Sequence, residues 1–179
     1  MNKKLRLLVT AECPNKCPMC CNNRFGLEKL PEVQTLAGYK EIMITGGEPL
    51  LFPKEVQTLC IHLKNRSNAK IYIYTANFDI EAFNVTSVMV DGYVYTPHSK
   101  KDVDEFLKLN DYLLQGHGPI YPLSLHLNIF PEVETFFPKE TDFYLWKLKK
   151  MHWIKDCPVP EGEDFCRINP LLSHETERR

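Results

Sequence analysis

The chain has 179 residues, which is enough for one well-buried core and too few for two. Its 22 basic and 23 acidic side chains nearly cancel, which excludes a broad basic surface for wrapping nucleic acid. The apolar run that follows Lys3-Lys4 extends only from residue 5 to residue 9. This run is too short for a signal peptide or a membrane-spanning helix, so we expect neither nucleic acid nor a membrane as a partner.

Strands and helices alternate in the first half of the chain. Val56, Leu59, Cys60 and Leu63 recur at helical spacing, whereas residues 70–75 are rich in the β-branched and aromatic side chains typical of strands. A helix is also expected between Pro31 and Gly38. We therefore predict strands at residues 4–10, 41–45 and 70–75, and helices at residues 32–38, 54–64 and 79–83.

The alternation continues in the second half, with strands predicted at 88–96 and 122–129 and helices at 100–115 and 142–151. Ser99 and Asp102 form a capping box in front of the helix at 100–115. From Trp153 onward the chain is dominated by Pro, Gly and acidic residues, so we expect no regular structure there.

Alternating strands and helices are typical of right-handed βαβ units around a parallel sheet. A closed eight-stranded barrel needs about 250 residues. The shorter chain therefore predicts an α/β fold in which about five or six parallel βα units form a partial, open barrel of the TIM type. We find no repeat and no linker, and predict one domain with a core at 1–152 and an irregular extension at 153–179.

The cysteines indicate the redox environment. The chain contains seven of them, an odd number, and Cys13, Cys17 and Cys20 are crowded as metal ligands are. Both features favour a reducing cytoplasm over a framework of disulfides.

The sequence C-P-N-K-C-P-M-C directly follows the first predicted strand. Three thiolates within it are able to hold three irons of an iron–sulfur cubane and leave the fourth iron open for a small molecule. The alternative is a zinc site, which normally has four ligands, often from two C-x-x-C knuckles. Here there is no second knuckle, so a zinc site would need Cys157 or Cys166 as its fourth ligand.

Gly46-Gly47-Glu48-Pro49 follows the second predicted strand. Two glycines permit backbone torsions closed to other residues, so a ligand is able to lie against bare main chain, and the carbonyls there accept hydrogen bonds from an ammonium group. The alternative is an ordinary strand-to-helix turn. Asn77 and His98 follow the third and fourth strands. Because the carboxyl ends of parallel strands meet at one edge, we expect these segments to converge on one pocket.

Together these residues resemble the radical S-adenosylmethionine superfamily. The C-x-x-x-C-x-x-C motif of that family is met by Cys13, Cys17 and Cys20, and its G-G-E motif by Gly46, Gly47 and Glu48 after the second strand. The resemblance in the order of elements extends over about residues 4 to 130.

The resemblance implies a 4Fe–4S cluster held by the three cysteines, with S-adenosylmethionine chelated to its open iron. The segment from Gly46 to Pro49 would hold the methionine ammonium group. Reduction by one electron would cleave the sulfonium to methionine and a 5′-deoxyadenosyl radical, which abstracts hydrogen from an unactivated carbon of the substrate.

Further cofactor-binding positions follow from the same resemblance. Met19 stands where the family usually has an aromatic residue near the adenine. Thr75 and Asn77 stand where the family often has T-N-G and would contact the ribose. Asn128 resembles a polar ribose contact, and its alternative is a surface-facing strand residue.

The resemblance implies an enzyme acting on a small molecule or a peptide, with flavodoxin or ferredoxin as the reductant. Short members of the superfamily include the 7-carboxy-7-deazaguanine synthases. One alternative is an activase that places a glycyl radical on a partner protein. A further alternative is a zinc-binding structural module without catalysis.

Overall fold

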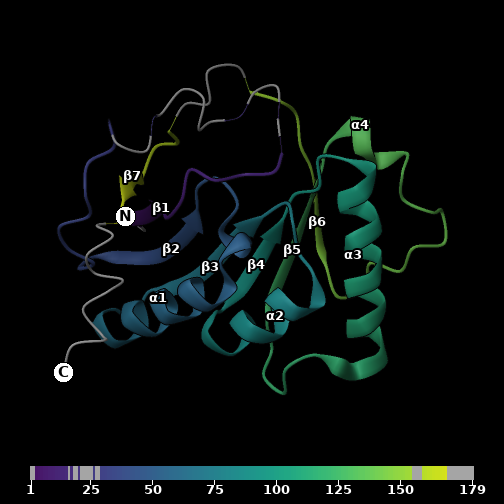
Figure 1. The fold of residues 1–179 in the computed structure, drawn as a ribbon, viewed down its shortest axis with the longest axis horizontal. Helices are drawn as coiled ribbons and strands as arrows, with labels where there is room; N and C mark the ends of the chain where they lie inside the picture. Colours follow the sequence, from purple (N-terminus) through teal and green to yellow (C-terminus); the bar gives the residue numbers. More distant parts are fainter. Residues whose placement is uncertain are drawn as a thin grey trace.

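One open, all-parallel sheet of seven strands organises the computed structural model, which describes residues 3–15, 17, 20, 26, 29–154 and 159–168 (Figure 1). Six strands follow one another across the sheet in chain order, and the last strand returns to pair with the first. The strands are β1 (Lys3–Leu8), β2 (Tyr39–Thr45), β3 (Lys70–Thr75), β4 (Gly92–Tyr95), β5 (Ser124–Ile129), β6 (Lys147–Lys150) and β7 (Glu163–Arg167). The predicted α/β class with a parallel sheet is therefore confirmed.

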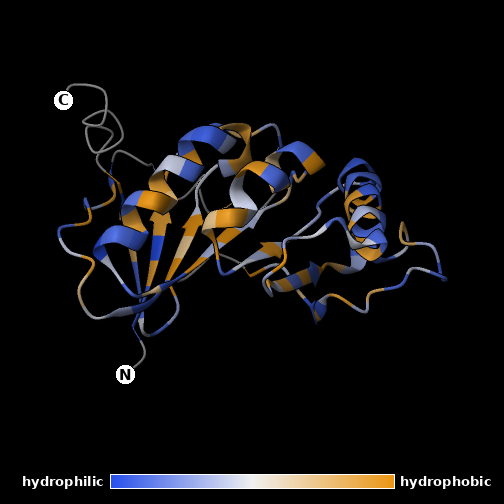
Figure 2. Cartoon of the chain, turned by 90° about the horizontal axis from the view of Figure 1, so that it is seen from below, coloured by the Kyte–Doolittle hydropathy of each residue, from blue (hydrophilic) through white to orange (hydrophobic). Residues whose placement is uncertain are grey.

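Helices lie between successive strands from β2 to β6. Figure 2 shows α1 and α2 together on one side of the sheet. Asp79 caps α2 by accepting a 2.7 Å hydrogen bond from the amide of Ala82, and the Ser99 hydroxyl caps α3 by accepting one of 3.2 Å from the amide of Asp102. The helices are α1 (Pro53–Arg66), α2 (Ile80–Thr86), α3 (Lys100–Tyr112) and α4 (Pro131–Glu134), with short helical turns at Pro49–Leu51, Ser87–Met89 and Leu113–His117.

The two faces of the sheet differ in chemistry. Because side chains alternate along a strand, every second residue faces the helices. These residues are apolar or aromatic and buried with the helices in one core, as at Ile71, Ile73, Tyr93 and Tyr95. Cys60 of α1 lies in the same core, as its spacing predicted. The opposite face carries polar side chains, among them Lys4, Arg6, Tyr72, His126 and Asn128.

The helix predicted at residues 32–38 is wrong. Residues 31–33 are extended and form a bridge to β7, in which the amide of Val33 donates to the Arg167 carbonyl at 3.0 Å. The amide of Arg167 donates in turn to the carbonyl of Pro31 at 2.9 Å. Pairing with a strand from the far end of the chain therefore overrides the local helical signal.

The helix predicted at residues 142–151 is also wrong, since residues 147–150 form the edge strand β6 beside β5. Asn110 of α3 fixes the entry to this strand. Its side-chain amide donates to the Asp142 carbonyl at 2.9 Å, and its oxygen accepts at 2.9 Å from the indole of the buried Trp146.

The expectation that residues 153–179 are irregular is corrected for residues 163–167, which form β7. Ion pairs hold this strand on β1, with Arg6 to Glu163 at 2.7 Å and Lys3 to Asp164 at 2.6 Å. Tyr39 also donates a hydrogen bond to Asp164. Residues 163–167 thus belong to the same sheet as β1.

Within the described part of the chain, no helix is both long and apolar enough to span a bilayer.

Candidate functional site

The three motif cysteines lie just beyond the carboxyl end of β1. Cys13 is exposed, and Cys17 and Cys20 are half-buried. The amide of Cys20 donates to the Cys17 carbonyl at 3.2 Å. Met19, predicted near the adenine of a bound cofactor, lies outside the described residues.

The thiols are close enough to influence one another electrostatically. Burial raises the pKa of Cys17 to about 11, and the neighbouring Cys20 and Cys13 contribute to this rise. Burial also raises the pKa of Cys13, against a hydrogen bond from the Asn15 amide that lowers it. Without a cation the loop therefore favours neutral thiols, and a bound metal centre would have to displace their protons.

Among the residues that the structure describes, no three His, Cys, Asp or Glu side chains lie close enough together to hold a single metal ion. In a cubane cluster each cysteine binds a different iron. The ligands of such a cluster therefore stand further apart than the ligands of one ion.

Gly46 and Gly47 contact the beginning of the cysteine loop, by which we mean the segment from the end of β1 to the motif cysteines. The amide of Gly47 donates to the Thr10 carbonyl at 2.7 Å, and the amide of Glu48 donates to the Glu12 carbonyl at 2.7 Å. A β-carbon on Gly46 would lie 2.5 Å from the Thr10 oxygen, and one on Gly47 would lie 2.0 Å from the Glu12 oxygen. The space left by both glycines is thus filled by the cysteine loop itself.

Gly46 has a second reason to be glycine. Its φ of +138° lies in a region that other residues rarely adopt. This torsion turns the chain out of β2 and towards the cysteine loop, as expected for a glycine at the end of a strand.

Glu48 joins the ends of β2 and β3. It is 1% exposed, and its carboxylate accepts hydrogen bonds from Thr75 Oγ1 at 2.6 Å and from the amides of Leu50, Ala76 and Asn77 at 3.1, 2.9 and 3.1 Å. Burial raises its pKa, although all four donors lower it. Both carboxylate oxygens are therefore engaged within the protein.

These bonds bring most of the predicted cofactor-binding residues together. Gly46, Gly47, Glu48, Thr75 and Asn77 meet where β2 and β3 end, beside the base of the cysteine loop. The adjoining Pro49 is buried and begins a short helical turn. These segments therefore lie together at one edge of the sheet, and their convergence on one pocket stays a prediction.

Asn128 lies at the same edge in β5, on the face without the long helices. Its side-chain amide donates to Thr96 Oγ1 at 3.0 Å, just beyond the end of β4. The side chain is half-buried. It is thus held in place on the polar face, and its contact with a ribose stays a prediction.

An aromatic cluster that was not predicted from the sequence lies at this edge. His98 follows β4, Phe130 follows β5 and Trp153 follows β6. The Trp153 indole stacks on Phe130 at 4.2 Å between ring centroids and on His98 at 5.4 Å, with interplanar angles of 14° and 22°. For His98 and Phe130 the position directly after a predicted strand was the signal available in the sequence, whereas the strand before Trp153 was not predicted.

Asp102 links this cluster to the cysteines. Its carboxylate accepts a 2.8 Å hydrogen bond from the backbone amide of His98, and it is 3% exposed. Its negative charge is among the influences that raise the pKa of Cys13 and Cys17, after the larger effect of burial. The start of α3 and the cysteine loop therefore share one electrostatic environment.

Two buried polar atoms at this edge have no partner within the described structure: Asn15 Nδ2 in the cysteine loop and His98 Nδ1. A buried polar atom without a hydrogen bond lowers the stability of the fold, and a ligand or ion that binds there is able to supply the missing partner. The donor set of three thiols and these two unpartnered atoms fits a ligand or metal cluster at this position.

Comparison of the chain with models of known protein families gave no match. Comparison with curated proteins likewise gave none.

Proposed function

We propose that the protein is a radical S-adenosylmethionine enzyme that uses a 4Fe–4S cluster bound by Cys13, Cys17 and Cys20. The observation that carries this proposal is the docking of the cysteine loop on the Gly-Gly-Glu segment through two backbone hydrogen bonds of 2.7 Å. The two motifs that define the resemblance thus form one physical unit. When bound, the cluster would supply the electron that cleaves the sulfonium of S-adenosylmethionine.

The residues of this chain would hold and orient that chemistry. The three cysteines would bind the cluster, and the Asn15 amide that bonds the Cys13 sulfur would help to set its potential. Glu48 would act through the protein, since its carboxylate fixes the ends of β2 and β3. The carbonyl groups of Gly46 and Gly47 would accept hydrogen bonds from the methionine ammonium group, since the space beside their α-carbons is filled by the cysteine loop.

Asn128 and the aromatic cluster of His98, Phe130 and Trp153 supply the remaining walls at the same edge of the sheet. Their aromatic surface excludes water, which protects a reactive species from quenching. We infer that the substrate, a small molecule or a peptide, enters on this side.

We also infer that the open sheet is an incomplete barrel of the TIM type. The order β7-β1-β2-β3-β4-β5-β6 supports this inference, because it is the cyclic order of a barrel interrupted between β6 and β7. An interrupted barrel would leave the polar inner face open to cofactor and substrate.

The test is an anaerobic assay on the full chain. Protein reconstituted with iron and sulfide should contain about four of each per chain and should cleave S-adenosylmethionine to methionine and 5′-deoxyadenosine when reduced with dithionite. Flavodoxin or ferredoxin, the proposed physiological reductants, should replace dithionite.

Cys17→Ala should abolish both iron loading and cleavage. Cys166→Ala is the matched control, because Cys166 lies within β7 opposite Leu7 and outside the cysteine motif, and should change neither. A colourless protein that binds zinc tightly, or loses its metal in Cys166→Ala, would overturn the proposal in favour of a zinc module.

A further inference from the structure

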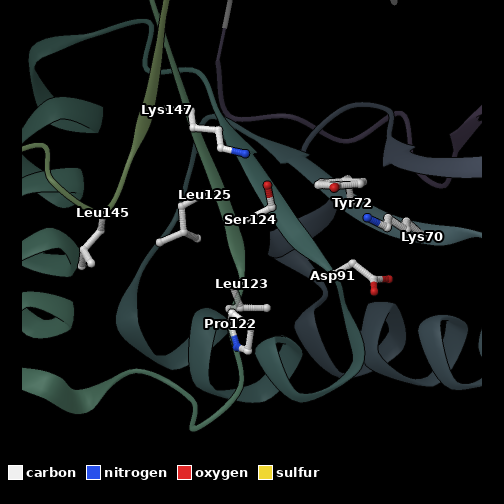
Figure 3. A pocket seen from close by; sticks show the side chains of 9 residues that line it. All are labelled: Lys70, Tyr72, Asp91, Pro122, Leu123, Ser124, Leu125, Leu145 and Lys147. Atoms are coloured by element: carbon white, nitrogen blue, oxygen red, sulfur yellow. The ribbon is translucent and has the colours of Figure 1, made fainter.

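A second polar site lies at the opposite edge of the sheet from the cysteine loop. A pocket of about 430 Å³ opens where β3, β5 and β6 begin, and Lys70, Tyr72, Asp91, Ser124 and Lys147 line it (Figure 3). Because the strands are parallel, their starts are a strand length away from the edge that carries the cysteines. We call this site the basic pocket.

The charge balance of the basic pocket is positive. The side-chain ammonium groups of Lys70 and Lys147 form no hydrogen bond or ion pair within the part of the chain that the structure describes. Asp91 does not neutralise them, because its carboxylate pairs with Lys64 outside the pocket at 2.5 Å and accepts from the amide of Ile71 at 2.8 Å. The ammonium groups of Lys70 and Lys147 therefore leave an excess of positive charge at this cavity.

The hydroxyl groups beside these lysines are held in fixed positions. Gly92 leaves room for Tyr72, since a β-carbon there would lie 2.9 Å from its ring and 2.1 Å from the Ser124 carbonyl. The Tyr72 ring meets His126 edge-on at 6.1 Å, and Ser124 Oγ hydrogen-bonds His126 Nε2 at 2.8 Å. The pocket is therefore pre-organised on its polar side.

The other side of the pocket is apolar and includes Pro122 and Leu123, which lie together below Ser124 in Figure 3. Small-molecule sites combine such an apolar wall with a few polar groups that fix the orientation of the ligand. In Figure 3 the Lys147 side chain and the Ser124 hydroxyl point into the same space, and Tyr72 lies beyond them.

We propose that the basic pocket binds a small organic anion, whose carboxylate or phosphate group is attracted by the ammonium groups of Lys70 and Lys147 that line it and whose apolar body lies against Pro122 and Leu123. Ammonium groups form strong charge-assisted hydrogen bonds with either oxyanion. The Ser124 hydroxyl is positioned to add a further hydrogen bond. This site does not depend on the cluster, so it stands or falls separately from the proposed radical chemistry.

The test is a titration of the ¹⁵N-labelled full chain with inorganic phosphate and, separately, with benzoate, followed by amide NMR shifts at constant ionic strength. We expect saturable shifts at Lys70, Ser124 and Lys147 with either anion. The anion that binds more tightly identifies the group that the pocket prefers.

Lys70→Gln/Lys147→Gln should weaken binding at least tenfold. Lys54→Gln/Lys149→Gln, which removes the same charge from exposed positions outside the pocket, should leave the affinity unchanged. Shifts that do not saturate, or that weaken equally in both double variants, would overturn the proposal. Cys17→Ala should bind the anion like the wild type, whatever its effect on S-adenosylmethionine cleavage.

Discussion

Gly47 donates its backbone amide to the carbonyl oxygen of Thr10 at 2.7 Å, and this bond docks the cysteine loop on the end of β2. The contact explains why two motifs that are distant in sequence occur together. The loop cannot approach β2 this closely if a side chain stands at Gly47. Substitution there should therefore affect the metal site directly.

Gly47→Ala should displace the cysteine loop, because the new β-carbon would lie 2.0 Å from the Glu12 oxygen. We expect the free energy of unfolding to fall by about 1 to 3 kcal/mol. We also expect the reconstituted variant to contain less iron per chain than the wild type. Gly118→Ala is the control, since its β-carbon would meet nothing closer than Leu113 at 3.5 Å. Denaturant unfolding and iron analysis measure both effects, and a fully loaded Gly47→Ala would contradict the docking account.

Glu48→Ala should destabilise the fold by about 3 kcal/mol, because it leaves Thr75 and three backbone amides without their buried acceptor. Glu48→Gln keeps one oxygen and should lose less than half as much. Glu41→Ala, which breaks only a partly exposed pair with Lys4, should change stability by about 1 kcal/mol or less. Equal losses in Glu48→Ala and Glu41→Ala would show that Glu48 does not join β2 and β3.

Metal binding should release protons, because burial raises the pKa of Cys13 and raises that of Cys17 to about 11. Calorimetric titration with Cd²⁺ in buffers of different ionisation enthalpy should show a release of protons near neutral pH, and a smaller release per chain in Cys17→Ala. Loading should weaken as the pH falls. A heat of binding independent of the buffer would refute the prediction.

The raised pKa of Cys17 also affects the stability of the metal-free protein, in the alkaline pH range. Because the folded pKa of Cys17 lies above its ordinary value of 9.0, the folded state binds this proton more tightly than the unfolded state does. The stabilisation is complete below about pH 9 and is lost as the pH rises through about 11. Alkaline unfolding of the metal-free chain should become less steep in Cys17→Ala.

His98→Phe should keep the ring stack on Trp153 and remove the unpartnered Nδ1. We expect its stability to stay within about 1 kcal/mol of the wild type, since a ring of similar size fills the same space. Burial lowers the pKa of His98, because the folded state disfavours the charged imidazolium. The protein is therefore most stable above the ordinary pKa of His98 and loses stability as the pH falls below it. His98→Phe should accordingly flatten the loss of stability below about pH 6.

If His98 Nδ1 meets a ligand, His98→Phe should also weaken S-adenosylmethionine cleavage by at least tenfold. Separate measurement of kcat and KM distinguishes a lost contact from a packing defect. Unchanged kinetics with unchanged stability would assign His98 to packing alone.

The local sequence pattern predicted most of this fold, because most helices and strands form where their own residues favour that structure. Residues 70–75 form β3 with the predicted bounds, since their β-branched and aromatic side chains fit a buried strand. The elements that were missed depend on distant partners. Residues 31–33 extend only because β7 lies beside them, and β6 forms against β5 with Asn110 fixing its entry.

The candidate site, like the fold, was predicted in part from the sequence. Ligands bind at the carboxyl ends of parallel strands, and this rule alone assigns the cysteines, Gly46-Gly47 and Asn77 to one edge of the sheet. The role of Glu48 as a buried acceptor for four donors was not predictable, because it depends on the spatial approach of β3. The stacking of Trp153 on His98 depends in the same way on β6, which the sequence did not indicate.

The most direct test of the central claim is Mössbauer spectroscopy of the anaerobically reconstituted, ⁵⁷Fe-labelled full chain, recorded before and after addition of S-adenosylmethionine. A cluster held by three cysteines has one iron without a protein ligand, so about one quarter of the iron signal should change its isomer shift when the cofactor binds. A spectrum in which all irons are equivalent and unaffected by the cofactor would contradict the account.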